Sequence, residues 1–223
     1  MSVTLETPAP APTGTAQRPI GTAVAGIALT ALSVAVSAPE YPEELTAASA
    51  REYVVANSDA LLRFGMSMAG CAVLLVVLLA YLRQRMTGVL RDVVFGSGLL
   101  VSVWLLVTGA FHASAALDID RADWKPDEMF LQTIGLQIAG DSIGSASTYA
   151  KGALMLAAGI AAIRTRFLPR WLGWLSVLLG GMAVGAGLGV VENPVTPVLF
   201  YGGLLGFAIW PLIVGVTILV RKP

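Results

Sequence analysis

The chain has 223 residues, of which 56% are hydrophobic and only 13% are charged. Soluble domains carry about 25% charged residues, so this composition excludes an ordinary soluble domain and indicates an integral membrane protein. Fourteen basic and fourteen acidic side chains give a formal net charge of zero. No excess of positive charge therefore favours a nucleic-acid partner.

The N-terminal segment differs in composition from the rest of the chain. Residues 1–18 are rich in proline, threonine and alanine and show no apolar periodicity. Such a composition is typical of disorder, and we predict a disordered cytoplasmic tail over this segment.

Six apolar stretches follow, at about residues 20–38, 61–82, 93–117, 145–163, 171–191 and 197–220. A bilayer core about 30 Å thick needs roughly 20 mostly apolar residues per helix. None of the stretches alternates with a period of two, so helices are favoured over barrel strands. The sequence predicts an all-α fold, a polytopic membrane helix bundle of six transmembrane helices in one domain, residues 19–222.

The first stretch has a second interpretation. Arg18, a short apolar core and the small residues VSA at 36–38 are also typical of a cleaved signal peptide. Pro39 would then become the first residue, which signal peptidase handles poorly. We therefore favour a first helix that is retained.

Charged residues alternate between the predicted loops. Twelve of the fourteen acids fall on one side of the spans, and nine of the fourteen basic residues fall on the other. By the positive-inside rule, both termini are predicted to be cytoplasmic and the acidic loops to face outward. The nine basic residues are Arg18, Arg83, Arg85, Arg91, Arg164, Arg166, Arg170, Arg221 and Lys222.

The stretch RTRFLPRWLGWLS, residues 164–176, separates the fourth and fifth apolar runs. Arginines resist translocation across a membrane, and tryptophans favour the headgroup level. We interpret this turn as a topological anchor without catalytic function. Its anchoring residues are Arg164, Arg166, Arg170, Trp171 and Trp174.

Glycines recur at helical spacing in the last two runs. Gly181, Gly185 and Gly189 lie every fourth residue, and Gly202 and Gly206 repeat the spacing. Small residues at this spacing let helices in lipid approach closely. The contact predicted here is with another helix of the bundle or with a second subunit; a glycine-lined permeation path is the less favoured alternative.

Three segments carry a resemblance: PEELTAASAREYVVANSDALLRFG, TRFLPRWLGWLSVLLGG and PLIVGVTILVRKP. Together they resemble an uncharacterised family of six-span bacterial integral membrane proteins, a domain of unknown function that is frequent in high-GC bacteria. The resemblance covers most of residues 20–222. It implies a multi-pass protein of the bacterial cytoplasmic membrane, and it implies no activity and no catalytic residue.

Neither a cofactor nor a metal site is predicted. Cys71 is the single cysteine, which excludes an internal disulfide and a multi-cysteine metal site. His112 is the single histidine and supplies too few ligands for a bis-histidine haem. We expect Cys71 to be a small buried or lipid-facing side chain.

Five ionisable residues share a depth near the outer ends of the predicted helices: Arg63, His112, Asp141, Lys151 and Glu192. Ionisable groups in a membrane are costly and are candidate functional sites by default. If the helix ends converge, these side chains form an outward-facing polar pocket. That pocket is a hypothesis based on shared depth alone.

Each of these residues also has a structural interpretation, which we favour singly. The stem of Lys151 extends to the outer headgroups, and Arg63 pairs with Asp59 one helical turn away. His112 bonds a neighbour, although its usual pKa of about 6.5 also suits a proton relay. Glu192 lies in a solvated loop.

The outer segment 118–144 contains the apolar stretch MFLQTIGLQIAG, which is too short to span a bilayer. An interfacial helix, or an extension of the next span, is the favoured interpretation. A lid over the polar pocket is the alternative.

Three functional hypotheses follow from these patterns. The favoured one is a non-catalytic binding or scaffolding module whose partners are the lipid bilayer and either a second copy or another membrane protein. A transporter or channel is the alternative, disfavoured because the helix centres offer only serine, threonine and glycine. The third is an intramembrane enzyme for a lipid-like substrate, with His112 or Glu192 as its acid or base.

Overall fold

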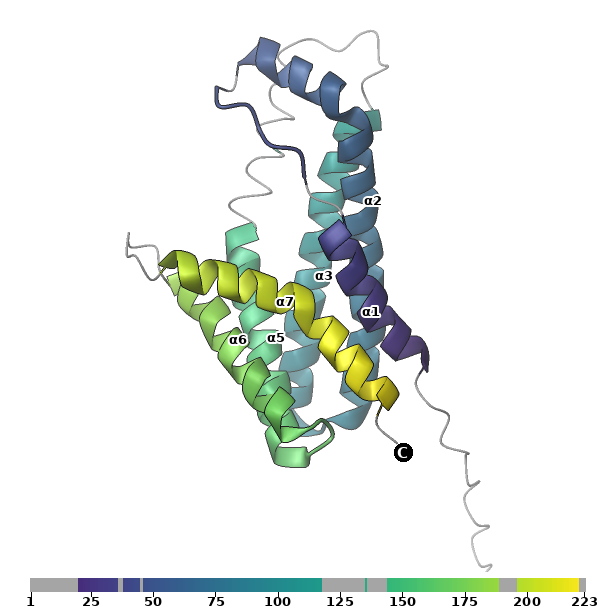
Figure 1. Cartoon of the computed structure of the whole chain (residues 1–223), viewed down its shortest axis with the longest axis vertical. Helices are drawn as coiled ribbons and strands as arrows, with labels where there is room; N and C mark the ends of the chain where they lie inside the picture. Colours follow the sequence, from purple (N-terminus) through teal and green to yellow (C-terminus); the bar gives the residue numbers. More distant parts are fainter. Residues whose placement is uncertain are drawn as a thin grey trace, which may run out of the picture.

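The computed structural model describes residues 20–35, 38–44, 46–117, 135, 144–188 and 196–220. Over these residues the fold is all-α, as predicted (Figure 1). Six helices are described: α1 Ile20–Ala35, α2 Ala47–Arg85, α3 Gly88–Leu117, α5 Gly144–Thr165, α6 Arg170–Leu188 and α7 Thr196–Val220. The predicted tail over 1–18 lies outside the described residues, as does the predicted interfacial segment apart from Gly135 and Gly144.

Four of the described helices, α2, α3, α5 and α7, are long and apolar enough to cross a membrane. Helix α1 is shorter, with 16 residues, and α6 is not among the four. Successive helices run in opposite directions, with α2 and α3 joined at one end and α5 and α6 joined at the same end (Figure 1). The alternation required for six spans is present, and the six-span topology itself stays a prediction.

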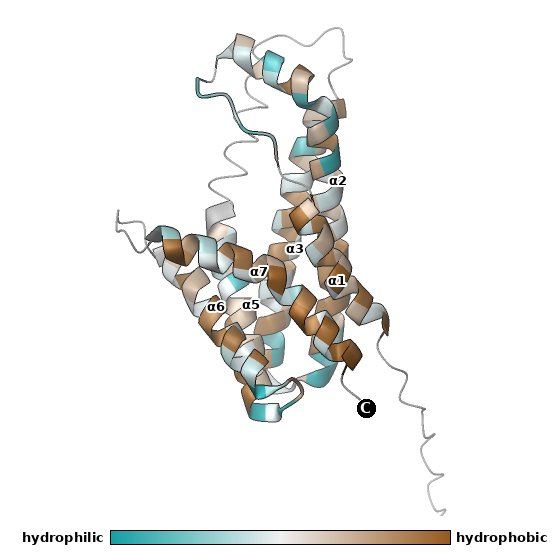
Figure 2. Cartoon of the chain, in the orientation of Figure 1, coloured by the Kyte–Doolittle hydropathy of each residue, from teal (hydrophilic) through white to brown (hydrophobic). Residues whose placement is uncertain are grey.

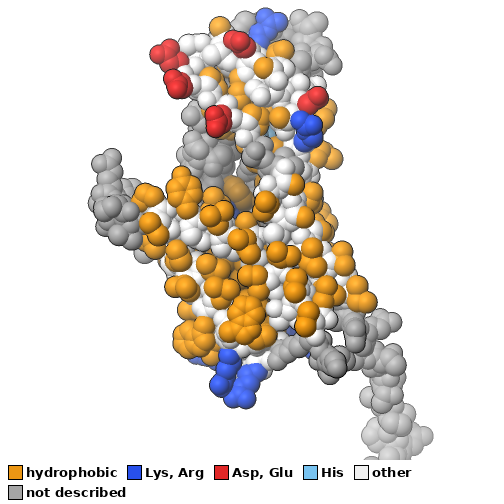
Figure 3. Space-filling model, viewed as in Figure 1, with side chains coloured by type: hydrophobic (Ala, Val, Ile, Leu, Met, Phe, Trp, Pro, Cys, Tyr) orange, Lys and Arg blue, Asp and Glu red, His pale blue; other side chains and the backbone are white. Residues whose placement is uncertain are grey.

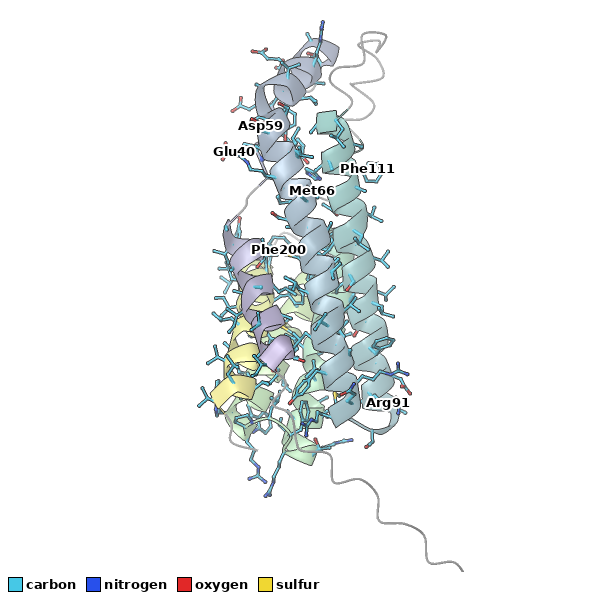
Figure 4. All side chains as sticks on the ribbon, turned by 90° about the vertical axis from the view of Figure 1, so that its right-hand side faces the viewer. Glu40, Asp59, Met66, Arg91, Phe111 and Phe200 are labelled. Carbon is cyan, nitrogen blue, oxygen red and sulfur yellow. The ribbon has the colours of Figure 1, made fainter. Side chains whose placement is uncertain are left out.

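Helix α2 is much longer than the predicted span 61–82. Its 39 residues begin at a capping box formed by Thr46 and Ser49, and they extend roughly 58 Å at 1.5 Å per residue. Together with α3 it projects beyond the other helices (Figure 4). Hydropathy alone missed the first turns of α2 because Arg51, Glu52 and Asp59 are compatible with a helix but not with lipid.

Close backbone contacts hold neighbouring helices together at glycines. A methyl group added at Gly65 of α2 would lie 2.6 Å from the carbonyl oxygen of Gly109 in α3. A methyl group at Gly159 of α5 would lie 2.6 Å from the carbonyl oxygen of Gly173 in α6. Only glycine fits at such contacts, where one backbone lies directly against another.

Gly181 of α6 makes no packing contact with the described helices of this chain, and the predicted alternative of contact with a second subunit stays a prediction. That residue is exposed, and an added methyl group would meet nothing within 4 Å. Its neighbour Gly180 is buried instead, against Gly152 and Leu156 of α5. The spacing was correct, but the contact face is one residue away, because sequence spacing does not fix the rotation of a helix about its axis.

The other predicted packing glycines fall in different places. Gly202 and Gly206 of α7 lie against the side chains of Met182 and Leu179 in α6, as expected of packing positions. Gly185 meets only the end of Leu199. Gly189 lies outside the described residues.

Helices α1 and α7 pack against each other on one side of the bundle. A methyl group added at Gly26 would lie 2.5 Å from the carbonyl oxygen of Pro211, and the Thr30 hydroxyl donates to the carbonyl of Ala208 at 2.8 Å. On the α6 side, Trp210 Nε1 donates to Ser176 Oγ at 2.8 Å. Helix α7 bends along its length (Figure 1) and contains Pro211, whose missing N–H weakens the helix there.

Charged side chains gather at the two ends of the molecule (Figure 3). Among the described residues, the projecting end carries five acids, Glu40, Glu43, Glu44, Glu52 and Asp59, and the opposite end carries six arginines, Arg83, Arg85, Arg91, Arg164, Arg166 and Arg170. Apolar side chains cover the surface between them, and the hydropathy colouring shows the same band along the helices (Figure 2).

Candidate functional site

The side chain of Lys151 lies inside the bundle. It comes from α5, is 4% exposed, and places Nζ 4.0 Å from the centroid of the Trp104 ring in α3. The Phe207 ring of α7 lies 5.6 Å from the same nitrogen. Three helices therefore surround one amine with apolar and aromatic groups. The predicted path of this side chain to the outer headgroups is wrong.

No ion pair is formed between Lys151 and a carboxylate among the described residues. Contacts with aromatic faces stabilise a desolvated cation by about 2 kcal/mol. Removing an ammonium group from water costs several kcal/mol even after the protein relaxes. The aromatic contacts alone therefore leave the charged form of Lys151 under-compensated.

Two further polar atoms, both on the face of α3 that carries Trp104, lack a partner. Trp104 Nε1 and Thr108 Oγ1 are buried and make no hydrogen bond. The two residues are four apart on α3, so they occupy the same face of that helix on consecutive turns. Buried polar groups are nearly always hydrogen-bonded, and two unsatisfied donors on the α3 face that meets Lys151 through Trp104 point to a missing partner.

The depth of this cluster follows from the helices that carry it. Exposed apolar side chains of α3 run from Val89 to Leu117, and Trp104 lies within one residue of the middle of that run. On α5, Lys151 is 13 residues from Arg164, which corresponds to about 20 Å. Along α5 and α3, the cluster therefore lies well away from the arginine-rich end.

His112 lies two turns further along α3 and is 1% exposed. Its Nδ1 lies 2.7 Å from the carbonyl oxygen of Thr108, an acceptor, so Nδ1–H donates there. Nε2 then accepts from the Tyr41 hydroxyl at 3.5 Å. The Phe64 ring of α2 packs edge-on against the imidazole, with centroids 4.7 Å apart. The expectation that this histidine bonds a neighbour is confirmed.

Residues 38–44 lie against the projecting part of the α2–α3 pair, where Tyr41 meets His112. The rings of Tyr41 and Tyr53 are 5.5 Å apart, and the Tyr53 hydroxyl donates to the carbonyl of Pro39 at 3.2 Å. A small apolar cluster of Val54, Leu61 and Ala115 lies beneath them. Sequence reasoning missed Tyr41, because a lone tyrosine in a loop carries no signal of its contacts.

The predicted outward pocket stays a prediction, because part of it lies outside the described residues. Arg63 is exposed on α2, outside the buried cluster, and its expected ion pair with Asp59 is not formed within 4.0 Å. Asp141 and Glu192 lie outside the described residues. Of the five predicted residues, His112 and Lys151 are the two that the structure shows buried.

The predicted anchor residues lie together around the α5–α6 turn. Arg166 closes α5 with a positive φ of 56°, and its N–H donates to the carbonyl of Ala162 at 2.9 Å. All five predicted anchors, Arg164, Arg166, Arg170, Trp171 and Trp174, are exposed. Exposure at one end of the bundle is what an anchor at a membrane surface requires.

The described residues contain no group of three or more histidine, cysteine, aspartate or glutamate side chains that would hold a metal ion. Cys71 is buried, as expected, with Sγ 3.7 Å from the carbonyl oxygen of Leu29. No family model matches the chain, and neither a curated protein nor a solved structure was found to be similar to it. The resemblance to a six-span bacterial family stays a prediction.

Proposed function

We propose that the protein is a six-span integral membrane protein of the bacterial cytoplasmic membrane, with both termini inside, and that it binds a small ligand without transforming it. The arginine-rich end, the acidic end and the apolar band between them support this placement (Figure 3). The bilayer itself is its first partner.

The site of binding is the cluster of Lys151, Trp104 and Thr108. The observation that carries this proposal is a buried amine against the ring of Trp104, whose Nε1 is itself buried without a partner, as is the Thr108 hydroxyl one turn further along the same face of α3. Lys151 Nζ, Trp104 Nε1 and the Thr108 hydroxyl are all donors. A carboxylate accepts from all three and neutralises the amine. Because the surroundings are apolar, the rest of the ligand is apolar as well.

Binding is favoured over catalysis by the state of His112. An acid–base role needs a ring nitrogen within reach of substrate. Both nitrogens of His112 are engaged, one with the Thr108 carbonyl and the other with the Tyr41 hydroxyl.

A brominated fatty acid tests the proposal, because bromine quenches the fluorescence of a nearby tryptophan. Dibromostearate added to the purified full chain is expected to quench Trp104 saturably, whereas its methyl ester, which lacks the charge, is expected to bind at least tenfold more weakly. Lys151→Met is expected to lower the affinity for dibromostearate at least tenfold, which corresponds to about 1.4 kcal/mol of binding free energy.

Two control variants complete this experiment. Thr30→Val removes a buried hydroxyl elsewhere in the bundle, bonded to Ala208, and is expected to leave binding unchanged. Trp104→Phe is expected to remove the saturable quenching. Equal affinities for the acid in the native chain and in Lys151→Met, or for the acid and its ester, would refute the proposal.

Transport is the second candidate. Trp104, Thr108 and His112 follow one another every fourth residue on α3, from mid-helix toward its outer end. A polar stripe leading to a buried lysine also suits proton or ion movement. Liposomes carrying an internal pH dye separate the two functions. A proton flux that is lost in Lys151→Met favours transport, and absence of flux with retained dibromostearate binding favours the binding module.

A further inference from the structure

A groove opens at the arginine-rich end of the molecule, between the last turns of α2 and the first turns of α3. Its volume is about 540 Å³, within the range of small-molecule sites. On α3 the lining residues Arg91 and Phe95 precede Trp104 by nine residues or more, so the inference below rests on the proposed membrane placement but not on the ligand proposed for Lys151. The lining residues are Val76, Ala80, Arg83, Gln84, Arg91 and Phe95.

Two of the lining residues, Arg83 and Arg91, are basic. The Arg83 guanidinium lies 4.6 Å from the centroid of the Phe95 ring, which holds it at the groove wall. Arg91 uses Nε to donate to Asp92 at 3.0 Å. A guanidinium has five N–H donors, so the terminal nitrogens of Arg91 keep four of them. Arg83 forms no ion pair among the described residues.

The rest of the groove is apolar and exposed. Val76, Ala80 and Arg83 lie at positions i, i+4 and i+7 of α2, so they share one face of the helix. Both apolar side chains are exposed. Over roughly 10 Å along α2, the groove therefore passes from a lipid-like surface to two guanidinium groups.

This order of surfaces matches one kind of molecule. A phospholipid places apolar acyl chains beside a phosphate, and arginine binds phosphate through paired N–H donors. Basic pockets between transmembrane helices at the membrane surface are suited to anionic headgroups. We propose that the groove is a binding site for an anionic phospholipid of the leaflet in contact with the α2–α3 turn. Its phosphate lies between Arg83 and Arg91 and an acyl chain lies over Ala80 and Val76.

Native mass spectrometry of the full chain tests this site. The protein is supplied with phosphatidylglycerol and phosphatidylcholine in equal amounts, and the ratio of the two lipids retained is measured. The native chain is expected to retain more phosphatidylglycerol. Because each basic residue near a membrane surface contributes about fivefold, Arg83→Gln and Arg91→Gln are each expected to lower the ratio by that factor.

Arg85→Gln is the matched control, because Arg85 lies at the same end of α2 but contacts Tyr81 outside the groove lining. It is expected to leave the ratio within twofold of the native value. Ala80→Trp fills the apolar part without changing charge, on an exposed position that tolerates a larger side chain, and is expected to lower retention of phosphatidylglycerol.

Three outcomes would overturn the proposal. If Arg85→Gln lowered the lipid ratio as much as Arg83→Gln and Arg91→Gln, the lipid would be held by diffuse charge attraction and not by the groove. An unchanged ratio in Arg83→Gln and Arg91→Gln would remove the arginines from the site. Displacement of phosphatidylglycerol by 10 mM inorganic phosphate would identify a site for free anions in place of a lipid site.

Discussion

The amine of Lys151 lies 4.0 Å from the centroid of the Trp104 ring, with the two residues on different helices, α5 and α3. Trp104 contributes its ring face to the amine, while its own Nε1 is buried without a partner. The pair therefore combines an under-compensated cation with an unused donor. One acceptor group placed between α3 and α5 would bond both the Lys151 amine and Trp104 Nε1. The expected effects of substitutions at these two residues follow from this arrangement.

Replacement of Lys151 by methionine is expected to stabilise the ligand-free protein. Methionine keeps the length and the apolar part of the side chain and removes the buried amine. A buried polar group without a partner costs about 1–3 kcal/mol, and the free energy of unfolding should rise by an amount of that order. Denaturation of the delipidated protein measures it. A lower stability of Lys151→Met would mean that the amine has a partner in the folded chain.

The two buried tryptophan N–H groups are expected to respond differently to the same substitution. Trp210 Nε1 donates to Ser176 at 2.8 Å, so Trp210→Phe loses a hydrogen bond worth about 1 kcal/mol in addition to packing. Trp104 Nε1 has no partner, so Trp104→Phe should cost less in the ligand-free protein. Thermal unfolding of both variants measures the difference. A larger loss in Trp104→Phe would contradict it.

Close contact at Gly65 is expected to exclude even a methyl group. Gly65→Ala places the new carbon 2.6 Å from the backbone oxygen of Gly109, and overpacking of this kind costs about 1–3 kcal/mol. Gly181→Ala is the matched control, because nothing lies within 4 Å of an added carbon there. Alanine also favours helix over glycine by roughly 1 kcal/mol. Chemical unfolding should therefore give a lower free energy of unfolding for Gly65→Ala and a higher one for Gly181→Ala. Equal changes in the two variants would refute the close contact at Gly65.

Labelling of single cysteines is expected to place Glu43 and Arg164 on opposite sides of the membrane. Both residues are exposed, whereas the native Cys71 is buried and should react slowly. In intact cells, a membrane-impermeant maleimide should label Glu43→Cys and reach Arg164→Cys only after the membrane is permeabilised. Equal labelling of both positions in intact cells would contradict the proposed topology.

The sequence predicted the helices well where hydropathy alone decides their limits. The spans expected at 93–117, 145–163 and 197–220 correspond closely to α3, α5 and α7. The prediction was poor where a helix leaves the apolar band, as at the start of α2. There the capping pair Thr46 and Ser49 carried the signal, because a capping box marks a helix start whatever the hydropathy that follows.

Other features were decided by the rotation and depth of each helix. Spacing predicted a glycine contact on α6, but only the packed bundle selected Gly180 over Gly181. Lys151 was expected at the headgroups, and the neighbouring helices instead enclose it beside Trp104 and Phe207. Arg63 was expected in the same pocket, and its side chain is exposed on α2.

The sequence by itself determined the all-helical class, the order of the helices and the sorting of acids from arginines. These properties depend on sums over neighbouring residues, because the transfer of a helix into lipid adds up residue by residue along the chain. Only the tertiary structure decided that the amine of α5 meets the indole of α3, and that Arg83 and Arg91 share a groove. Such contacts between helices depend on how each helix is rotated and tilted when it packs against its neighbours.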